Sequence, residues 1–188
     1  KIGVAMDTIA VVLRQPEQIE LDRLALSLPT PDDVVVDVDW SGVSTGTERL
    51  LWSGRMPPFP GMGYPLVPGY ESVGRVVEAG SDTDVLPGQH VFVPGAKCFG
   101  EVRGLFGASA SRLVVPAKRV VPLDRNLGER GILLALAATA YHAIAARGAS
   151  APDCIVGHGV LGRLLARISI ALRNDPPTVW EKNPARAG

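Results

Sequence analysis

A glycine-rich loop near the end of the chain carries the clearest chemical signal. The run Gly-His-Gly-Val-Leu-Gly follows an apolar strand pattern and precedes a helical one. In a G-x-G-x-x-G loop the first glycine allows a tight turn, the second lets the backbone approach a pyrophosphate, and the third lets helix and strand pack closely. The first helical amides then face the phosphates. The sequence thus predicts a nucleotide site at Gly157, Gly159, Val160, Leu161 and Gly162.

An acidic residue stands where such a site needs one. Glu181 ends the next predicted strand, 24 positions after Gly157, and these units place a ribose-binding acid roughly 20 positions on. A carboxylate there accepts a hydrogen bond from the 2′-hydroxyl and repels a 2′-phosphate, which favours NAD over NADP. Its neighbour Lys182 is also assigned to the cofactor, although its charge opposes that preference. The alternative is a glycine-rich turn in an unrelated α/β unit.

A second group of residues suits a flat apolar ligand. Aromatic, methionine and proline side chains gather within thirteen residues, where proline fixes the backbone and aromatic rings offer apolar area at low entropic cost. We assign substrate binding to Trp52, Met56, Phe59, Met62 and Tyr64. The alternative is a proline-rich loop that only covers the domain beneath it.

The elements that position these residues change character near residue 126. Before it, short β-rich runs separated by proline and glycine predict a closed or partly closed barrel, its first two strands forming a hairpin. The predicted strands are Ile9 to Leu13, Gln18 to Leu24, Val34 to Val38, Ser72 to Ala79, His90 to Val93, Arg112 to Pro116 and Arg119 to Leu123.

After residue 126 the pattern becomes helical. Asn126 with Glu129 three positions later is a capping signal, an Ala- and Leu-rich helix runs from Gly131 to Ala146, and Gly148 ends it. A strand–helix–strand unit follows. Its elements are Asp153 to Val156, Val160 to Leu172 and Thr178 to Trp180.

These patterns predict a catalytic β-domain at 6–126, a connecting helix at 127–150 and the start of an NAD-binding Rossmann domain at 151–188. Residues 1–5, before Met6, read as an extension foreign to the natural protein. A Rossmann domain needs about six strands and this one supplies two. We therefore expect a truncated chain that binds NAD poorly and turns over nothing by itself.

Composition narrows the class of protein. Nineteen basic residues balance nineteen acidic ones, which gives no electrostatic case for nucleic acid or an anionic membrane. The longest apolar stretch, Ile132 to Ala146, is shorter than the ~20 residues of a membrane span. Two distant cysteines, Cys98 and Cys154, suggest buried thiols in a reducing cytoplasm rather than a disulfide framework.

The order of these parts resembles the medium-chain dehydrogenase/reductase superfamily. Ser41 to Ser44, Pro68 to Gly74, Pro87 to Val91 and Thr139 to Ala143 resemble family segments that precede the glycine-rich loop. The resemblance implies a GroES-like, partly closed β-barrel followed by a Rossmann domain, an α+β and α/β architecture. It also implies a homo-oligomer formed through Rossmann-domain residues after 188.

The resemblance fails at the zinc ligands. Ser44 stands where the family has a cysteine, Tyr70 where it has a histidine, and Ala135 where a third ligand would lie. Only Cys98 remains in the region of the family's four-cysteine loop. Catalytic zinc needs about three protein ligands such as thiolate or imidazole, so we predict no metal.

A narrower resemblance points to a substrate. Val43 to Gly54, Met56 to Gly61 and Ile155 to Leu161 are similar to the bacteriochlorophyllide dehydrogenases of this superfamily. That resemblance implies NAD-dependent oxidation of the 3-(1-hydroxyethyl) group of a bacteriochlorophyllide, a tetrapyrrole, to a 3-acetyl group during bacteriochlorophyll biosynthesis for photosynthesis.

Without zinc, protein groups must hold the alcohol oxygen and take its proton. The family positions suggest donors at Ser44, Thr45 and Tyr70, and bases or relays at Glu48, Glu71 and His142. Tyr70 with Glu48 is the first choice, because both flank the vacated zinc position. Alternatively, Ser44 and Tyr70 are inert replacements, Glu71 holds loop backbone, and His142 is a hydrogen-bonded core residue.

Two other functions compete with the dehydrogenase. One is a zinc-free quinone or enone reductase that uses NADPH, against which Glu181 argues. The other is a non-enzymatic module that binds a tetrapyrrole, against which the intact glycine-rich loop argues.

Overall fold

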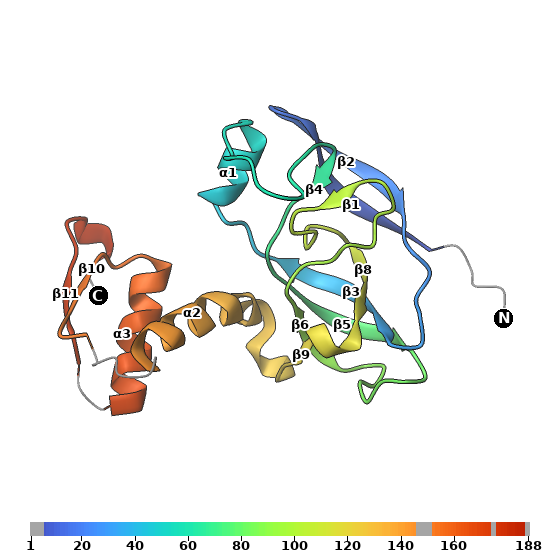
Figure 1. Cartoon of the computed structure of the whole chain (residues 1–188). Coiled ribbons are helices and arrows are strands. Elements are labelled where there is room, and N and C mark those ends of the chain that lie inside the picture. The colour runs from blue at the N-terminus through green and yellow to red at the C-terminus, as the bar shows by residue number, and fades with distance from the viewer. Residues whose placement is uncertain (1–5, 146–151, 174–175, 187–188) are drawn as a thin grey trace. The chain divides into compact units, whose positions relative to one another are not determined.

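The chain folds into two compact units, residues 1–132 and 133–188 (Figure 1). The structure, a computed structural model, describes residues 6–145, 152–173 and 176–186. Within these ranges no helix has the length and apolar character needed to cross a membrane.

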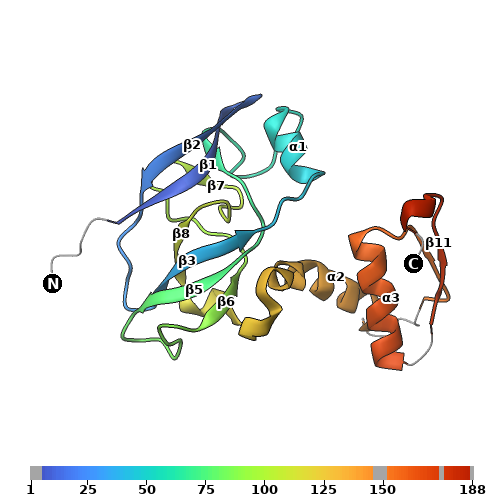
Figure 2. The same cartoon turned by 180° about the vertical axis from the view of Figure 1, so that it is seen from behind.

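The first unit consists of two β-sheets around a common core (Figures 1 and 2). One sheet has the order β2-β1-β4-β7 and the other β8-β3-β5-β6-β9. An isolated antiparallel bridge also pairs Ala10 of β1 with Ala110, just before β8. The strands are β1 (Asp7–Gln15), β2 (Gln18–Ala25), β3 (Asp33–Ser41), β4 (Leu66–Val67), β5 (Ser72–Ala79), β6 (His90–Val93), β7 (Arg103–Gly104), β8 (Arg112–Pro116) and β9 (Val121–Pro122). The predicted β-domain and its opening hairpin are confirmed.

The core follows from the strand patterns. In β1 the alternate residues Thr8, Ala10 and Val12 are buried, as a strand with one face on the core requires. In β3, which lies between β8 and β5, Val34, Val35 and Val36 are all buried. Both strands contribute to one hydrophobic cluster.

One predicted strand is shorter than expected. Arg119 belongs to the 3₁₀ turn η1 (Ala117–Arg119), where the amide of Val120 donates to the carbonyl of Ala117 at 3.2 Å. Strand β9 is therefore limited to Val121–Pro122. Proline has no amide hydrogen to continue a ladder.

The second unit holds α2 (Leu134–Ala145), β10 (Cys154–Val156), α3 (Val160–Arg173), β11 (Thr178–Trp180) and the 3₁₀ turn η3 (Pro184–Arg186). Strands β10 and β11 pair in parallel, which confirms the predicted strand–helix–strand unit. Cys98 is buried as predicted, but the prediction of a buried Cys154 is wrong. Strand β10 pairs with β11 alone in the described part of the chain, which leaves Cys154 exposed.

The predicted start of the connecting helix at Gly131 is also wrong. The segment η2 (Arg125–Leu133) is 3₁₀ and breaks at Gly128, whose φ of 50° and ψ of −133° are not helical. Asn126 does not cap a helix; its own amide donates to Asp124 Oδ1 at 2.8 Å. The α-helix begins at Leu134, and its predicted end at Gly148 lies outside the described residues.

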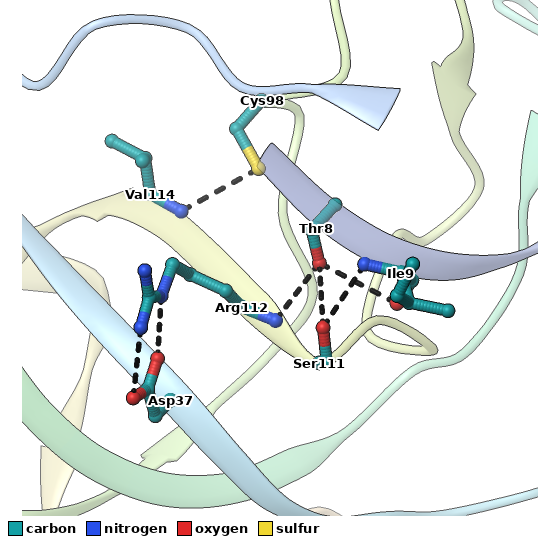
Figure 3. A network of polar contacts seen from close by, with 7 residues as sticks. All are labelled: Thr8, Ile9, Asp37, Cys98, Ser111, Arg112 and Val114. Atoms are coloured by element: carbon teal, nitrogen blue, oxygen red, sulfur yellow. Dashed lines mark hydrogen bonds and ion pairs between the residues drawn. The ribbon is translucent and has the colours of Figure 1, made fainter. Parts of the chain in front are cut away.

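A polar network ties β1 to β8 and β3 (Figure 3). Buried Thr8 accepts a hydrogen bond from the amide of Arg112 at 2.9 Å, and its hydroxyl lies 3.2 Å from that of Ser111. The Arg112 guanidinium then forms two hydrogen bonds with Asp37, at 2.6 and 3.0 Å. Thr8 therefore satisfies a backbone amide where strands of the two sheets meet.

Thr8→Val should lower the free energy of unfolding by about 1–3 kcal/mol, because the isosteric valine leaves the Arg112 amide without its acceptor. Thr8→Ser keeps the hydroxyl and serves as the control. Denaturant unfolding monitored by circular dichroism measures both. A Thr8→Val protein as stable as the parent would show that this hydrogen bond does not hold the sheets together.

Candidate functional site

A mainly apolar cavity of about 450 Å³ lies in the first unit beside α1 (Thr47–Trp52). Thr45, Glu48 and Trp52, all predicted site residues, contribute to its wall. The lining is Val11, Leu13, Ile19, Ser41, Val43, Thr45, Glu48, Arg49, Trp52, Pro68 and Ser109.

Helix α1 presents the functional side chains because of its spacing and its anchor. Glu48 and Trp52 are four residues apart, so they share a face of the helix. Leu51 is buried and packs against Leu13, Leu66 and Leu105. The first turn closes when the amide of Glu48 donates to the carbonyl of Ser44 at 2.9 Å.

The Glu48 carboxyl is buried without a hydrogen-bonded donor or a cation to balance it among the described residues. Both of its oxygens are inaccessible, and neither accepts a hydrogen bond of normal geometry from the described residues. Burial raises the pKa of this carboxyl, and repulsion by Glu71 adds to the effect. The backbone amides of Ser44 and Gly69 partly offset both by favouring the charged form. The carboxylate of Glu48 is therefore more basic than that of an exposed glutamate.

Glu71 lies close to Glu48 and is also buried, which raises its pKa. Its carbonyl accepts the amide of Gly42 at 2.9 Å. A Cβ atom added to Gly42 would lie 2.7 Å from Cγ2 of Ile132 and 2.8 Å from Cγ and Oε1 of Glu71, so a larger residue there would displace the Glu71 side chain. Glu71 therefore binds loop backbone through its main-chain carbonyl, as the alternative interpretation expects. Its side-chain carboxyl instead repels that of Glu48.

The other predicted catalytic residues are placed differently. Thr45 is exposed and lines the cavity, Ser44 is half-buried, and the half-buried ring of Tyr70 stacks on Phe106 with centroids 4.4 Å apart. Neither Ser44 nor Tyr70 belongs to the cavity wall. His142 is exposed on α2 in the second unit, so it is not a core residue. The catalytic roles of Ser44, Tyr70 and His142 stay predictions.

The predicted substrate residues divide by their packing. Trp52 lines the cavity and Phe59 is partly exposed. Met56, Met62 and Tyr64 pack against the leucine cluster around Leu51, and the Tyr64 hydroxyl donates to the carbonyl of Leu51. These three side chains therefore pack where α1 is anchored by Leu51. Their contact with substrate stays a prediction.

Sequence reasoning missed the hairpin wall of the cavity. Val11, Leu13 and Ile19 come from β1 and β2, far from α1 in sequence. A signal was present, because Ile19 and Leu21 are apolar residues at alternate positions of a strand whose other residues there are charged. Only the fold shows that this face turns toward Glu48.

The backbone of the glycine-rich loop has the geometry that the motif predicts for its three glycines. Gly157 has φ of 99°, and a Cβ atom on Gly162 would lie 2.0 Å from the carbonyl oxygen of Gly157. Nothing lies within 4 Å of such an atom on Gly159, so its backbone is open to a ligand. These features fit a bound dinucleotide.

Glu181 reaches the same loop. Its carboxylate accepts the amides of Asn183 and His158, both at 2.8 Å. These hydrogen bonds lower the pKa of Glu181, the Asn183 amide most strongly, so the group is ionised at neutral pH. Each oxygen keeps a lone pair for another donor. Lys182, next to it, is exposed.

Within the ranges that the structure describes, no three His, Cys, Asp or Glu side chains lie close enough together to hold a metal ion.

Residues 30–125 match the alcohol dehydrogenase GroES-like domain family. Two curated relatives carry the name 2-desacetyl-2-hydroxyethyl bacteriochlorophyllide A dehydrogenase. The one from Rhodobacter capsulatus is 58% identical over 182 residues, and the one from Cereibacter sphaeroides is 56% identical over 186. In both comparisons the match covers 96% of this chain and 58% of the relative.

A crystal structure of an Escherichia coli alcohol dehydrogenase complexed with NADH has the same fold. Its TM-score is 0.77 at 19% identity, over 96% of this chain and 58% of that one. The chain therefore belongs to the alcohol dehydrogenase GroES-like domain family. It is similar to the bacteriochlorophyllide A dehydrogenases and spans little more than half of their length.

Glu48→Gln should stabilise the folded protein at neutral pH. The amide keeps the shape but removes a charge that burial disfavours, for a gain on the order of 1 kcal/mol in this partly exposed setting. A raised pKa means that the folded state holds the proton to higher pH than the unfolded chain does. The parent therefore loses stability as the pH rises from the unfolded pKa through the folded one.

Thermal unfolding between pH 4 and pH 8, at roughly half-unit steps across the carboxyl range, tests this. The stability difference between Glu48→Gln and the parent should grow with pH, whereas the control Glu101→Gln, at an exposed position, should follow the parent. A Glu48→Gln protein that is less stable at every pH would mean that the carboxylate has a favourable partner.

Proposed function

We propose that the whole protein is a zinc-independent, NAD-dependent cytoplasmic dehydrogenase that oxidises the 3-(1-hydroxyethyl) group of a bacteriochlorophyllide to a 3-acetyl group. The observation that carries the proposal is the unpartnered carboxyl of Glu48 in an apolar cavity. The names of relatives 58% and 56% identical to this chain support the substrate.

Oxidation of a secondary alcohol removes a proton from oxygen and a hydride from carbon. The Glu48 side chain lines this mainly apolar cavity, and we assign the proton of the bound hydroxyl to its carboxylate, which must turn from its buried position toward the substrate. Because burial raises the pKa of Glu48, its carboxylate is more basic than an exposed one. Thr45, on the same wall, can donate a hydrogen bond to the substrate oxygen as charge develops there.

Bound NAD would supply the hydride acceptor. Gly157, Gly159 and Gly162 fit its pyrophosphate, and the E. coli relative of the same fold was crystallised with NADH. The ionised Glu181 carboxylate would accept a ribose hydroxyl and repel a 2′-phosphate.

The donor set does not fit catalytic zinc. Ser44 and Tyr70 stand at two family ligand positions and Ala135 at the third, and zinc sites are built mainly from thiolate, imidazole and carboxylate. Glu48 lines the cavity, and its carboxyl is repelled by that of Glu71. Proton removal is therefore assigned to the protein itself.

The direct test is oxidation of 3-(1-hydroxyethyl) bacteriochlorophyllide a by the full-length protein with NAD, followed through the pigment spectrum with and without a strong chelator. We expect 3-acetyl product at the same rate in both. Loss of activity with the chelator would contradict the zinc-free mechanism. An unchanged spectrum with NAD bound would favour a reductase, and an unchanged spectrum without NAD binding would favour a tetrapyrrole-binding module.

Glu48→Gln should lower kcat by about 10²–10⁴-fold, the usual contribution of a general base, with little change in substrate binding. In the parent, kcat should fall as the pH drops through the raised pKa of Glu48. Tyr70→Phe tests the donor role predicted for Tyr70, and Glu101→Gln is the control. A Glu48→Gln enzyme with parental kcat would remove Glu48 from the chemistry.

Cofactor preference tests the second unit. Glu181→Gln should raise the NADP to NAD ratio of kcat/KM roughly tenfold, equivalent to about 1.4 kcal/mol, because it removes the charge that repels a 2′-phosphate. Lys182→Gln should shift the ratio the other way. Equal ratios in all three proteins would show that neither side chain reads the ribose.

A further inference from the structure

The β1–β2 hairpin carries an exposed apolar face next to the cavity. Val11 pairs with Leu21 and Leu13 with Ile19, and residues directly opposite in an antiparallel pair share a face. Val11, Leu13 and Ile19 line the cavity. Leu21 therefore extends the same surface outward, with 74% of its area exposed and Ile19 at 61%.

On the opposite face of the hairpin, Ala10 and Val12 of β1 are buried in the core, and charged side chains form ion pairs beside them. Arg14 forms ion pairs with Glu20 and Asp22, which lie at the intervening positions of β2. At the turn, the amide of Glu17 donates to the carbonyl of Trp52 at 2.6 Å. This bond holds the hairpin against α1, and both views of the chain show the two side by side (Figures 1 and 2).

A second apolar wall faces the cavity from the chain around α1. Val43 is 73% exposed and Trp52 is 41% exposed, and both line the cavity together with Glu48. Exposed apolar groups that adjoin one another around a hollow mark a binding surface rather than scattered surface residues. Their arrangement around a buried carboxyl indicates a large apolar ligand that brings a polar group to Glu48.

The size of the cavity defines how such a ligand lies. At about 450 Å³ it can enclose a small ligand or part of a larger one. A tetrapyrrole ring is too broad to enter whole, so most of its flat face must rest on the surface outside. The cationic side chain of Arg49 also lines the cavity and suits the free carboxylate that a chlorophyllide carries.

We propose that the outer face of the β1–β2 hairpin, with Val43 and Trp52, is the platform on which the substrate's apolar macrocycle lies, while its hydroxyl-bearing arm enters the cavity toward Glu48. This inference rests on the proposed function for the identity of the substrate. To Trp52, which the sequence already assigns to substrate binding, it adds the hairpin residues and Val43.

The platform can be tested by removing exposed apolar side chains whose loss leaves the core intact. In the full-length protein, Leu21→Ser and Ile19→Ser should each raise KM for the bacteriochlorophyllide about tenfold, as expected when a large apolar side chain no longer contacts its ligand, with kcat unchanged. The matched control is Leu86→Ser, an equally exposed residue away from the cavity at 61%, which should behave like the parent.

A second substrate separates ring binding from the chemistry. A small secondary alcohol with an aromatic substituent but no macrocycle should show the same KM with the parent, Leu21→Ser and Leu86→Ser. Ile19→Ser is left out of this comparison because Ile19 lines the cavity. If KM for the pigment is the same in Leu21→Ser, Ile19→Ser and Leu86→Ser, the platform is wrong although the dehydrogenase stands. If the parent does not oxidise the pigment at all, the proposed function itself fails. Equal KM increases with both substrates would mean that the hairpin shapes the cavity and does not hold the ring.

Discussion

The site depends on one constraint, which is that the Glu48 carboxyl is buried without a hydrogen-bonded donor among the described residues. Such a group costs stability, so it persists only where the surrounding fold fixes it. Here the fixing elements are the Leu51 anchor of α1, the hairpin contact from Glu17 to Trp52, and the close approach of Glu71 to Gly42. Together they keep Glu48 at the cavity although neither of its oxygens is satisfied by the described residues.

The proposed function assigns to protein groups the step that zinc performs in other alcohol dehydrogenases. In a zinc-dependent alcohol dehydrogenase the metal acidifies the alcohol. By resemblance to the family, Ser44 and Tyr70 stand at two of the ligand positions. Burial raises the pKa of both Glu48 and Glu71, and repulsion by Glu71 raises that of Glu48 further. Under the proposed function, the Glu48 carboxylate would take the proton of the alcohol in place of a metal-bound group.

The sequence predicts the strands of the first unit closely, since β-branched runs such as Val34 to Val36 and turn residues between them are local signals. The glycine-rich loop and Glu181 were also predictable, because both belong to one short strand–helix–strand unit. The late start of α2 depends on Gly128, and the exposure of Cys154 depends on which strands flank β10. The alternation of Ile19 and Leu21 marks an apolar face, but its place at the cavity depends on how β2 and α1 meet in the fold, which no local pattern predicts.

The ionisation of Glu48 tests the central claim most directly. Carbon-13 NMR of the glutamate carboxyls in the full-length protein, with the signal assigned by its loss in Glu48→Gln, gives the pKa of this one group. A pKa above the ordinary glutamate value, rising further when the 3-acetyl product fills the cavity, would agree with a buried, unpartnered base. An ordinary or lowered pKa that product does not change would show that Glu48 is solvated or paired, and that the proton of the alcohol goes elsewhere.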